Sequence, residues 1–420
     1  MNNPIIGFAG LTHLGVNSAV ASAVKGFKTV GYDKNDDVIK SLSAGETKIQ
    51  EPELTEYLNS CFSLLNFSTN PKELTKCDIV YISTDVPTDE NGQSDLDPVI
   101  ELLEVVDRNV PETTAIVVLC QVPPGFSRNI KLGSAQLYYQ VETLIFGRAM
   151  ERALNPERFI IGCADPNRKI HEKFWQFLSA FSCPILQMRY ESAELCKTAI
   201  NLFLAANVCT SNSLAEVCEL IGADWSEIMP ALRLDKRIGN HAYIETGLGI
   251  SGGNIERDLS TVSDLSYEYG GNATFINGMV AHSRYRKQWP IQIFFQNVPR
   301  DLNPRVAILG VTYKPNTHSV KNSPALALID AISGYKIKAY DPAVSFLPDF
   351  SNVDFVDTAL DATKGAHVLC VMTPWTQIKT IDFDDLIQTM NPDFQLIIDP
   401  FRLIKKAPNS LYFSLGEKAK

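Results

Sequence analysis

The sequence predicts an α/β protein in which two Rossmann-like, doubly wound parallel-sheet domains are joined by a long central helix and a helical domain. Three observations predict this fold. Apolar runs typical of buried strands alternate with helical patterns in the first part of the chain, and the same alternation returns near the C-terminus. Between them, one unbroken helical pattern covers residues 192–221. Because parallel strands need crossover helices and are buried on both faces, such alternation is typical of doubly wound sheets.

The first predicted domain covers residues 1–190. It opens with an apolar strand at Ile5–Gly7, followed by a glycine-containing turn, an Ala/Val-rich helix at Ser18–Lys25 and a second strand that ends in VGYD. The apolar runs DIVYIST, TAIVVLC and FIIG continue the strand series, and a helix is expected around Val99–Val106. We expect these strands to form one parallel sheet.

A central domain is predicted over residues 191–300. Its main element is a helix at Ser192–Ile221, which has apolar residues at helical spacing and Gly222 as a C-cap. Shorter helices are expected at Trp225–Ala231 and Arg257–Tyr269. The long helix separates the two sheet domains.

The last predicted domain covers residues 301–420. The runs RVAILG, KIKAYDP, HVLCVMTP and QLIIDP resemble buried strands, and a helix is expected at Ala325–Ile332. This alternation predicts a second α/β sheet domain.

Composition narrows the range of partners. The chain has 420 residues and a formal net charge of −10, with a pI near 5.2. Nucleic acids and anionic membrane surfaces select for clustered Lys and Arg, so neither is an expected partner. No apolar run approaches the roughly 18–20 residues of a membrane span. The nine cysteines are scattered without CxxC spacing, which indicates reduced thiols, a cytoplasmic protein and no metal site.

A variant of the dinucleotide fingerprint follows the first strand. Gly10 and Gly15 occupy the first and third glycine positions of GxGxxG, but Thr12 replaces the second. Asp33 ends the second strand, where a carboxylate accepts from a ribose 2′-OH, so the pattern favours NAD over NADP. Loss of one close pyrophosphate contact at Thr12 costs about 1–3 kcal/mol, which weakens NAD binding without excluding it. The alternative is a Rossmann-type domain that no longer binds a dinucleotide.

Several longer segments together resemble the UDP-glucose/GDP-mannose dehydrogenase family along nearly the whole chain. They are GYD, DLDPV, VPPG, GRAMERALNPERFIIG, AELCKTAINLFLAANVCTSNSLAEVCELIGAD, DKRIGN, GGNIERD, ILGVTYKP, YDP and TPW. The resemblance implies NAD on the first domain, a nucleotide sugar on the third and a central domain that forms a homodimer. It also implies oxidation of the sugar C6 alcohol to a carboxylate with two NAD, through a cysteine thiohemiacetal.

The resemblance implies four catalytic residues. Lys197 and Asn201 match the family's catalytic Lys and Asn, and their i, i+4 spacing puts them on one helix face. Such donors stabilise a developing oxyanion or hold a water, although an incidental surface pair is the alternative. Glu142 matches a family glutamate whose neighbouring Asn and Pro are absent here. Asp258 matches an aspartate that orients water, and its alternative role is a helix N-terminal charge.

Further residues are implied for binding. On the substrate side they are Arg237, which the family sends across its dimer, Gly249, Gly252 and Lys314, with Arg402 aligned ambiguously. On the cofactor side, Lys321 replaces an arginine, and Gln121 stands where the family has a water-positioning threonine. Anionic pyrophosphates need such cationic donors, although each could be an ordinary surface charge.

The resemblance breaks at the reaction centre, because Asn254 stands in GISGGNIERD where the family has its nucleophilic cysteine. An amide cannot form a thiohemiacetal. The leading hypothesis is therefore an NAD-linked oxidoreductase for a UDP-type sugar that performs one oxidation or a redox-neutral step. A nucleotide-sugar-binding homologue without turnover is the rival, and an intact double dehydrogenase is the least favoured alternative.

Overall fold

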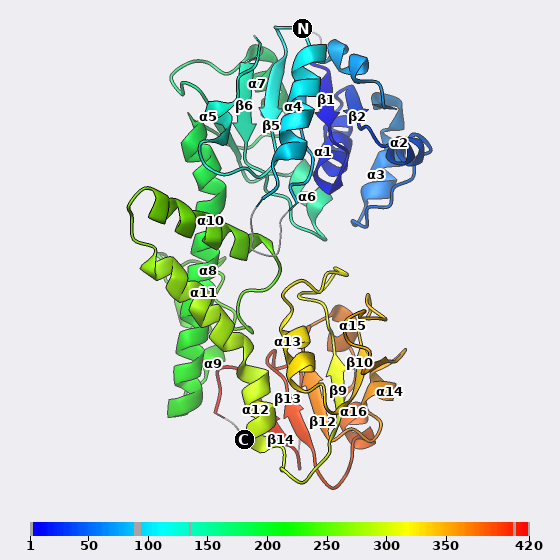
Figure 1. The fold of residues 1–420 in the computed structure, drawn as a ribbon, viewed down its shortest axis with the longest axis vertical. Coiled ribbons are helices and arrows are strands. Elements are labelled where there is room, and N and C mark those ends of the chain that lie inside the picture. Colours follow the sequence, from blue (N-terminus) through cyan, green and yellow to red (C-terminus); the bar gives the residue numbers. More distant parts are fainter. Residues whose placement is uncertain (1–2, 88–93, 134–135, 406–408, 419–420) are drawn as a thin grey trace. The chain divides into compact units, whose positions relative to one another are not determined.

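The computed structural model describes residues 3–87, 94–133, 136–405 and 409–418. The chain forms two compact units, residues 1–200 and 201–420 (Figure 1). One helix, α8 (Tyr190–Ile221), contains the boundary between them. Its observed bounds lie within two residues of the predicted ones, and Gly222 follows it with φ of +80°, as expected of a C-terminal glycine.

Unit 1 is built on an eight-stranded sheet with strand order β3-β2-β1-β4-β5-β6-β7-β8. Every pair in it is parallel except β6 and β7, so β7 and β8 run against the other six strands. The strands are β1 (Ile6–Ala9), β2 (Thr29–Tyr32), β3 (Leu65–Ser68), β4 (Ile79–Ile82), β5 (Ala115–Val118), β6 (Gln136–Gln140), β7 (Phe159–Cys163) and β8 (Ile185–Arg189).

Helices cover both faces of this sheet. Ile79 and Tyr81 of β4 pack in one cluster with α1, whereas Val80 and Ile82 pack in a second cluster with α4. The helices are α1 (His13–Val24), α2 (Asp36–Ser43), α3 (Leu54–Ser60), α4 (Asp97–Asn109), α5 (Phe126–Asn129), α6 (Ala149–Leu154) and α7 (Glu172–Ser179), with 3-10 turns η1 (Phe62–Leu64) and η2 (Pro71–Lys76). Burial on both faces explains why the central strands β1, β4 and β5 read as unbroken apolar runs.

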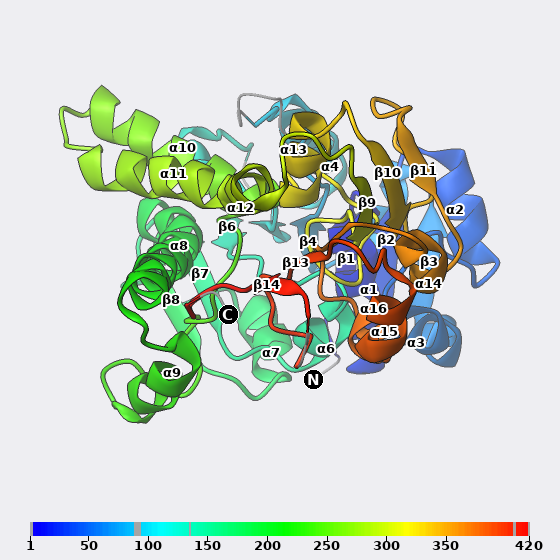
Figure 2. The same cartoon turned by 90° about the horizontal axis from the view of Figure 1, so that it is seen from below.

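Unit 2 joins the rest of α8 to a helical segment and a second sheet (Figures 1 and 2). The helices are α9 (Trp225–Leu234), α10 (Asn254–Glu268), α11 (Thr274–Lys287) and α12 (Trp289–Asn297). Helices α10 and α11 run side by side (Figure 2) and pack on α8 through Leu259, Ile276, Met279 and Cys209. This packing fixes the start of α10 relative to the unit 2 part of α8.

The second sheet is parallel throughout, with strand order β11-β10-β9-β12-β13-β14. Its elements are β9 (Arg305–Leu309), α13 (Pro324–Ala331), β10 (Lys336–Tyr340), β11 (Val353–Phe355), α14 (Ala359–Thr363), β12 (Val368–Val371), α15 (Thr376–Lys379), α16 (Phe383–Thr389), β13 (Leu396–Ile398) and β14 (Leu411–Phe413). Val306 and Ile308 face α12 and α13, while Ala307 and Leu309 face α14–α16. The predicted pair of doubly wound sheets is confirmed.

Candidate active site

The turn between β1 and α1 requires two of its glycines for steric reasons. Gly10 has φ of +91°, and a Cβ on it would lie 2.8 Å from the backbone nitrogen of Thr84. A Cβ on Gly15 would lie 1.9 Å from the carbonyl oxygen of Gly10. Thr12 has φ of −79°, which any residue adopts, so its side chain fits the turn without backbone strain.

This turn and the end of β2 together fit a dinucleotide. The first turn of α1 contains no acidic residue, so its N–H groups and the positive end of its dipole favour an anion such as pyrophosphate. Asp33 follows β2, and its carboxylate accepts from the backbone N–H of Leu11 at 2.8 Å and of Asn35 at 2.9 Å. The carboxylate is thereby held at the strand end, where a ribose hydroxyl is recognised in this kind of fold.

Two buried carboxylates that sequence reasoning missed hold the neighbouring loops. The side chain of Glu51 is fully buried, and it accepts from Nε2 of His13 at 2.8 Å and from the backbone N–H groups of Gly147 and Ala149. Glu194 of α8, also fully buried, accepts from the backbone N–H groups of Gly125 at 2.6 Å and Ser127 at 2.8 Å. Nothing local singles out Glu194, because the same stretch of α8 also carries Glu191 and Lys197. These contacts fix the loop that follows Gln121 and the loop before α6 within unit 1.

Glu142 and Lys197 form an ion pair in unit 1. Nζ of Lys197 lies 3.4 Å from Oε2 of Glu142, and the two side chains are only 16% and 18% exposed. The other carboxylate oxygen of Glu142 accepts from the backbone N–H of Leu144. Partial burial strengthens the interaction between the charges relative to a surface pair. The pairing of two predicted catalytic residues 55 positions apart was not evident from the sequence.

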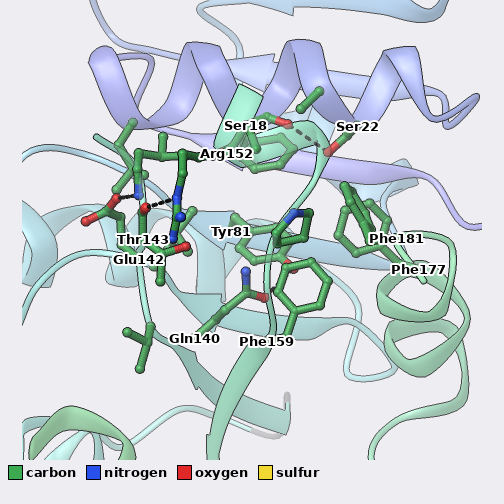
Figure 3. Close-up of a pocket in the computed structure, with 18 residues that line it drawn as sticks. Ser18, Ser22, Tyr81, Gln140, Glu142, Thr143, Arg152, Phe159, Phe177 and Phe181 are labelled. Carbon is green, nitrogen blue, oxygen red and sulfur yellow. Dashed lines mark hydrogen bonds between the residues drawn. The ribbon is translucent and has the colours of Figure 1, made fainter. Parts of the chain in front are cut away.

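A cavity of about 60 Å³ has Glu142 among the residues that line it (Figure 3). Aromatic rings line much of it, and Tyr81 donates to Oε1 of Gln140 at 2.9 Å within the wall. Arg152 donates from Nε to the carbonyl oxygen of Thr143 at 3.2 Å, which ties α6 to the Glu142 segment. Ligand pockets usually have roughly 300–1,000 Å³, so this cavity holds a few waters and not a dinucleotide or a sugar nucleotide.

Asn201 and Asp258 form the corresponding pair in unit 2. Asn201 donates from Nδ2 to Oδ2 of Asp258 at 2.5 Å, and Nε of Arg257 lies 3.6 Å from Oδ1. The Asp258 side chain is 2% exposed. Asp258 lies in the second turn of α10, and the acidic residue of the first turn is Glu256. The pairing with Asn201 therefore accounts for Asp258 better than a helix N-terminal role does.

The glycine-rich loop before α10 is closely packed by its neighbours. Gly249 has φ of +80° and Gly252 has φ of +79°. A Cβ on Gly249 would lie 2.5 Å from the carbonyl oxygen of Ser283, and one on Gly252 would lie 2.9 Å from the ring of Tyr313. The loop can therefore approach these groups only because both positions lack side chains.

Asn254 follows this loop as the exposed first residue of α10. Two of the predicted binding lysines lie close to the same loop. The end of the Lys321 side chain would lie 3.5 Å from a Cβ on Gly253, and the Lys314 ammonium lies 5.7 Å from the centre of the Tyr313 ring. The head of α10 is thus electropositive, through its dipole and through Lys321.

Two buried cysteines near predicted site segments are unsuited to nucleophilic chemistry. Cys209 packs in the same cluster as Ile250, and burial raises the pKa of its thiol to about 11. Cys120 is fully buried at the end of β5, where burial also raises its pKa and its Sγ donates to the carbonyl oxygen of Ile82. Both remain protonated at neutral pH, so neither supplies a thiolate.

Two predicted substrate arginines are paired elsewhere. Arg237 is exposed and donates from Nε and Nη2 to Asp235, at 2.9 and 2.6 Å. Arg402 donates from Nη1 to Asp224 at 2.6 Å and from Nε to the carbonyl oxygen of Leu415. Asp224 is the N-cap of α9, so Arg402 joins the C-terminal segment to that helix. This contact gives Arg402 a structural role, and its substrate role stays a prediction.

Three family models match the chain in succession. The NAD binding domain of the UDP-glucose/GDP-mannose dehydrogenase family matches residues 5–178, its central domain matches residues 191–283, and its UDP binding domain matches residues 307–406. The chain belongs to the UDP-glucose/GDP-mannose dehydrogenase family. Membership confirms NAD as the cofactor, a nucleotide sugar as the kind of ligand and an oxidoreductase acting on CH–OH groups as the enzyme class.

Relatives across this dehydrogenase family match the chain along its whole length. The UDP-glucose 6-dehydrogenase of Rickettsia conorii is 26% identical, covering 98% of this chain and 99% of the relative. TuaD, a UDP-glucose 6-dehydrogenase of Bacillus subtilis, is 25% identical, covering 99% and 93%. The solved UDP-glucose dehydrogenase of Pyrobaculum islandicum superposes with a TM-score of 0.85 at 26% identity, covering 98% of this chain and 97% of that one. Within the described residues, none of the helices is both long and apolar enough to cross a membrane.

Proposed function

We propose that this chain is an NAD-linked oxidoreductase of a UDP-type sugar that performs one two-electron oxidation or a redox-neutral step. The proposal rests on the identity of the side chain at the N-terminus of α10. An exposed amide, Asn254, begins α10, and the next turn of this helix carries the buried Asp258, which accepts from Asn201 of α8. The chain retains charged and amide groups suited to alcohol oxidation, but the amide cannot form the covalent thiohemiacetal through which the resemblance implies acid formation.

We assign the alcohol oxidation to side chains that accept the hydroxyl proton and stabilise the oxyanion. When bound, NAD supplies the hydride acceptor. Lys197 stabilises the charge that develops on the substrate oxygen, because its ammonium is held by Glu142 in a partly buried setting. Glu142 takes the hydroxyl proton as the general base. Asn201 holds the reacting oxygen or a water, and Asp258 fixes the orientation of that amide through their hydrogen bond.

Substrate binding is assigned to residues that suit an anionic nucleotide. Lys314 and Lys321 supply positive charge close to the glycine loop, and Gly249 and Gly252 allow this loop to pack against Ser283 and Tyr313 and so hold its shape for the substrate. Lys321 is also the residue proposed to serve the cofactor, together with Gln121. The proposed domains are residues 1–190 for NAD, 191–300 as the central domain and 301–420 for the nucleotide sugar. UDP-glucose is the first substrate to test, since relatives of comparable length are named UDP-glucose 6-dehydrogenases.

The function is tested by counting NADH. Purified protein is incubated with excess NAD and a limiting UDP- or GDP-sugar, and NADH and sugar products are measured after completion. We expect about one NADH per sugar, or a modified sugar with NADH recycled, because one hydride is removed without a thiohemiacetal. Two NADH per sugar together with uronic acid would contradict the proposal. Sugar binding without product would support the rival, a homologue that binds without turnover.

We further propose a homodimer formed through the central helices. Large apolar side chains are strongly exposed there, including Phe203 (75%), Leu220 (77%), Leu234 (80%), Tyr269 (79%) and Phe275 (70%). A monomer rarely leaves so much apolar surface in water, and the family models place this segment in the central domain. The nine free cysteines fit the reducing conditions of the cytoplasm, where we place the protein.

Replacing Phe203 with Asp should convert the dimer to a monomer. In the dimer, each subunit would bury an unpaired carboxylate at the interface, and the cost of removing these charges from water opposes association. Light scattering should give about twice the 46.5 kDa chain mass for wild type and the chain mass for Phe203→Asp. Phe346→Asp is the matched control, since Phe346 is similarly exposed (68%) but lies between β10 and β11. A dimer that persists in Phe203→Asp would exclude this surface.

A further inference from the structure

The segment that follows β4 lies directly on the glycine turn. Thr84 blocks any side chain at Gly10, as described above, and the next residue, Asp85, donates its backbone N–H to Oγ1 of Thr12 at 3.0 Å. The Thr12 hydroxyl in turn donates to the carbonyl oxygen of Ser83 at 3.3 Å. Thr12 therefore does more than replace a glycine, because its hydroxyl fastens the Asp85 backbone to the start of α1.

This backbone hydrogen bond places Asp85, which is an exposed residue, beside the N-terminus of α1. Desolvation by the surrounding chain raises the pKa of this carboxyl, and the charge of His13 and hydrogen bonds with Thr12 and the His13 backbone offset part of the rise. Glu142 adds a second negative charge nearby, which raises the pKa further. Among the described residues of this turn, Asp85 thus supplies the anion that the open end of α1 favours.

We propose that Asp85, positioned by Thr12, sets the NAD affinity of this chain by competing with the cofactor pyrophosphate for the N-terminus of α1. The pyrophosphate of a dinucleotide in this fold occupies that helix end. A carboxylate there uses the same donors and repels the incoming negative charge. NAD binds by displacing the Asp85 side chain from these donors, and the bound state retains the repulsion between carboxylate and phosphate.

The proposal predicts that neutralising Asp85 tightens NAD binding. Asp85→Asn keeps the size of the side chain and removes its charge, and NAD should bind about 10- to 100-fold more tightly by calorimetry without any sugar present. Asp165→Asn is the matched control. It makes the same charge change at a residue that follows β7. Because β7 runs antiparallel to β6, and β6 is parallel to β4, Asp165 and Asp85 lie at opposite ends of the strands.

A double-mutant cycle tests the role given to Thr12. Thr12→Gly removes the hydroxyl that holds Asp85, so it should tighten NAD binding in the wild-type chain and have a much smaller effect in Asp85→Asn. Equal effects of Thr12→Gly in both backgrounds would overturn the positioning role. Unchanged or weaker NAD binding by Asp85→Asn, with Asp85→Ala behaving alike and both variants folded by circular dichroism, would overturn the competition itself. Because the measurement uses NAD alone, its outcome is independent of the proposed sugar chemistry.

Discussion

Replacing Lys197 with Met should lower the rate of NADH formation from the nucleotide sugar by about 10²–10³-fold, the usual cost of removing one oxyanion-stabilising donor. The effect is expected to be large because Lys197 is 16% exposed and lies 3.4 Å from Glu142. Methionine keeps a similar length and removes the positive charge. The Glu142 carboxylate then lacks its partner, and the developing charge on the substrate oxygen lacks its donor.

The Lys197 measurement needs to separate chemistry from binding and folding. NAD affinity should stay within about threefold of wild type, since the variant alters an interaction of the transition state. Lys72→Met, at an exposed residue of η2, is the matched control and should keep wild-type activity. Activity close to wild type in Lys197→Met, at saturating NAD and sugar, would remove Lys197 from the proposed chemistry.

Restoring a thiol with Asn254→Cys should allow a second oxidation, so that about two NADH form per sugar and uronic acid accumulates. The head of α10 suits a thiolate, because the helix dipole and the nearby Lys321 ammonium both lower the pKa of a thiol placed there. The thiolate attacks the carbonyl carbon of the first product and forms a C–S bond. Hydride loss from that adduct and hydrolysis of the resulting thioester then give the acid and release the thiol.

Asn254→Ser is the control for this gain, since it removes the amide and adds a poorer nucleophile at the same position. The count of NADH per sugar and the mass of the sugar product distinguish the two variants. A folded Asn254→Cys protein that performs the first oxidation and still gives one NADH per sugar would show that more than the nucleophile has changed.

Strand patterns predicted the inner strands of both sheets except β6, and they did not predict the edge strands. The unpredicted strands are β3, β6, β8, β11 and β14. Each is only partly buried, and their sequences lack an unbroken apolar run. The reversal of direction between β6 and β7 was also unpredicted. Strand direction depends on the path of the connecting segment, which hydrophobic periodicity does not record.

Candidate site residues that belong to a local sequence motif were predicted, but the residues with which they form hydrogen bonds and ion pairs were not. The steric need for Gly10 and Gly15 follows from the strand-turn-helix pattern, and Lys197 and Asn201 share a helix face by their spacing. By contrast, nothing local indicates that Arg402 pairs with Asp224, 178 residues away. The substrate role that the resemblance implies for Arg402 stays a prediction, and in the folded chain its guanidinium donates to the N-cap residue of α9.

The amino-acid sequence alone determined the two sheets, the long helix between them and the residues at each glycine turn, because periodicity, capping and turn chemistry act over a few residues. The tertiary structure alone decided the pairings of Glu142 with Lys197 and of Asn201 with Asp258, and the hydrogen bond from the Asp85 backbone to the Thr12 hydroxyl. These contacts join residues 55 to 73 positions apart. Their energies depend on burial and on the position of the opposite charge, which exist only once the chain has folded.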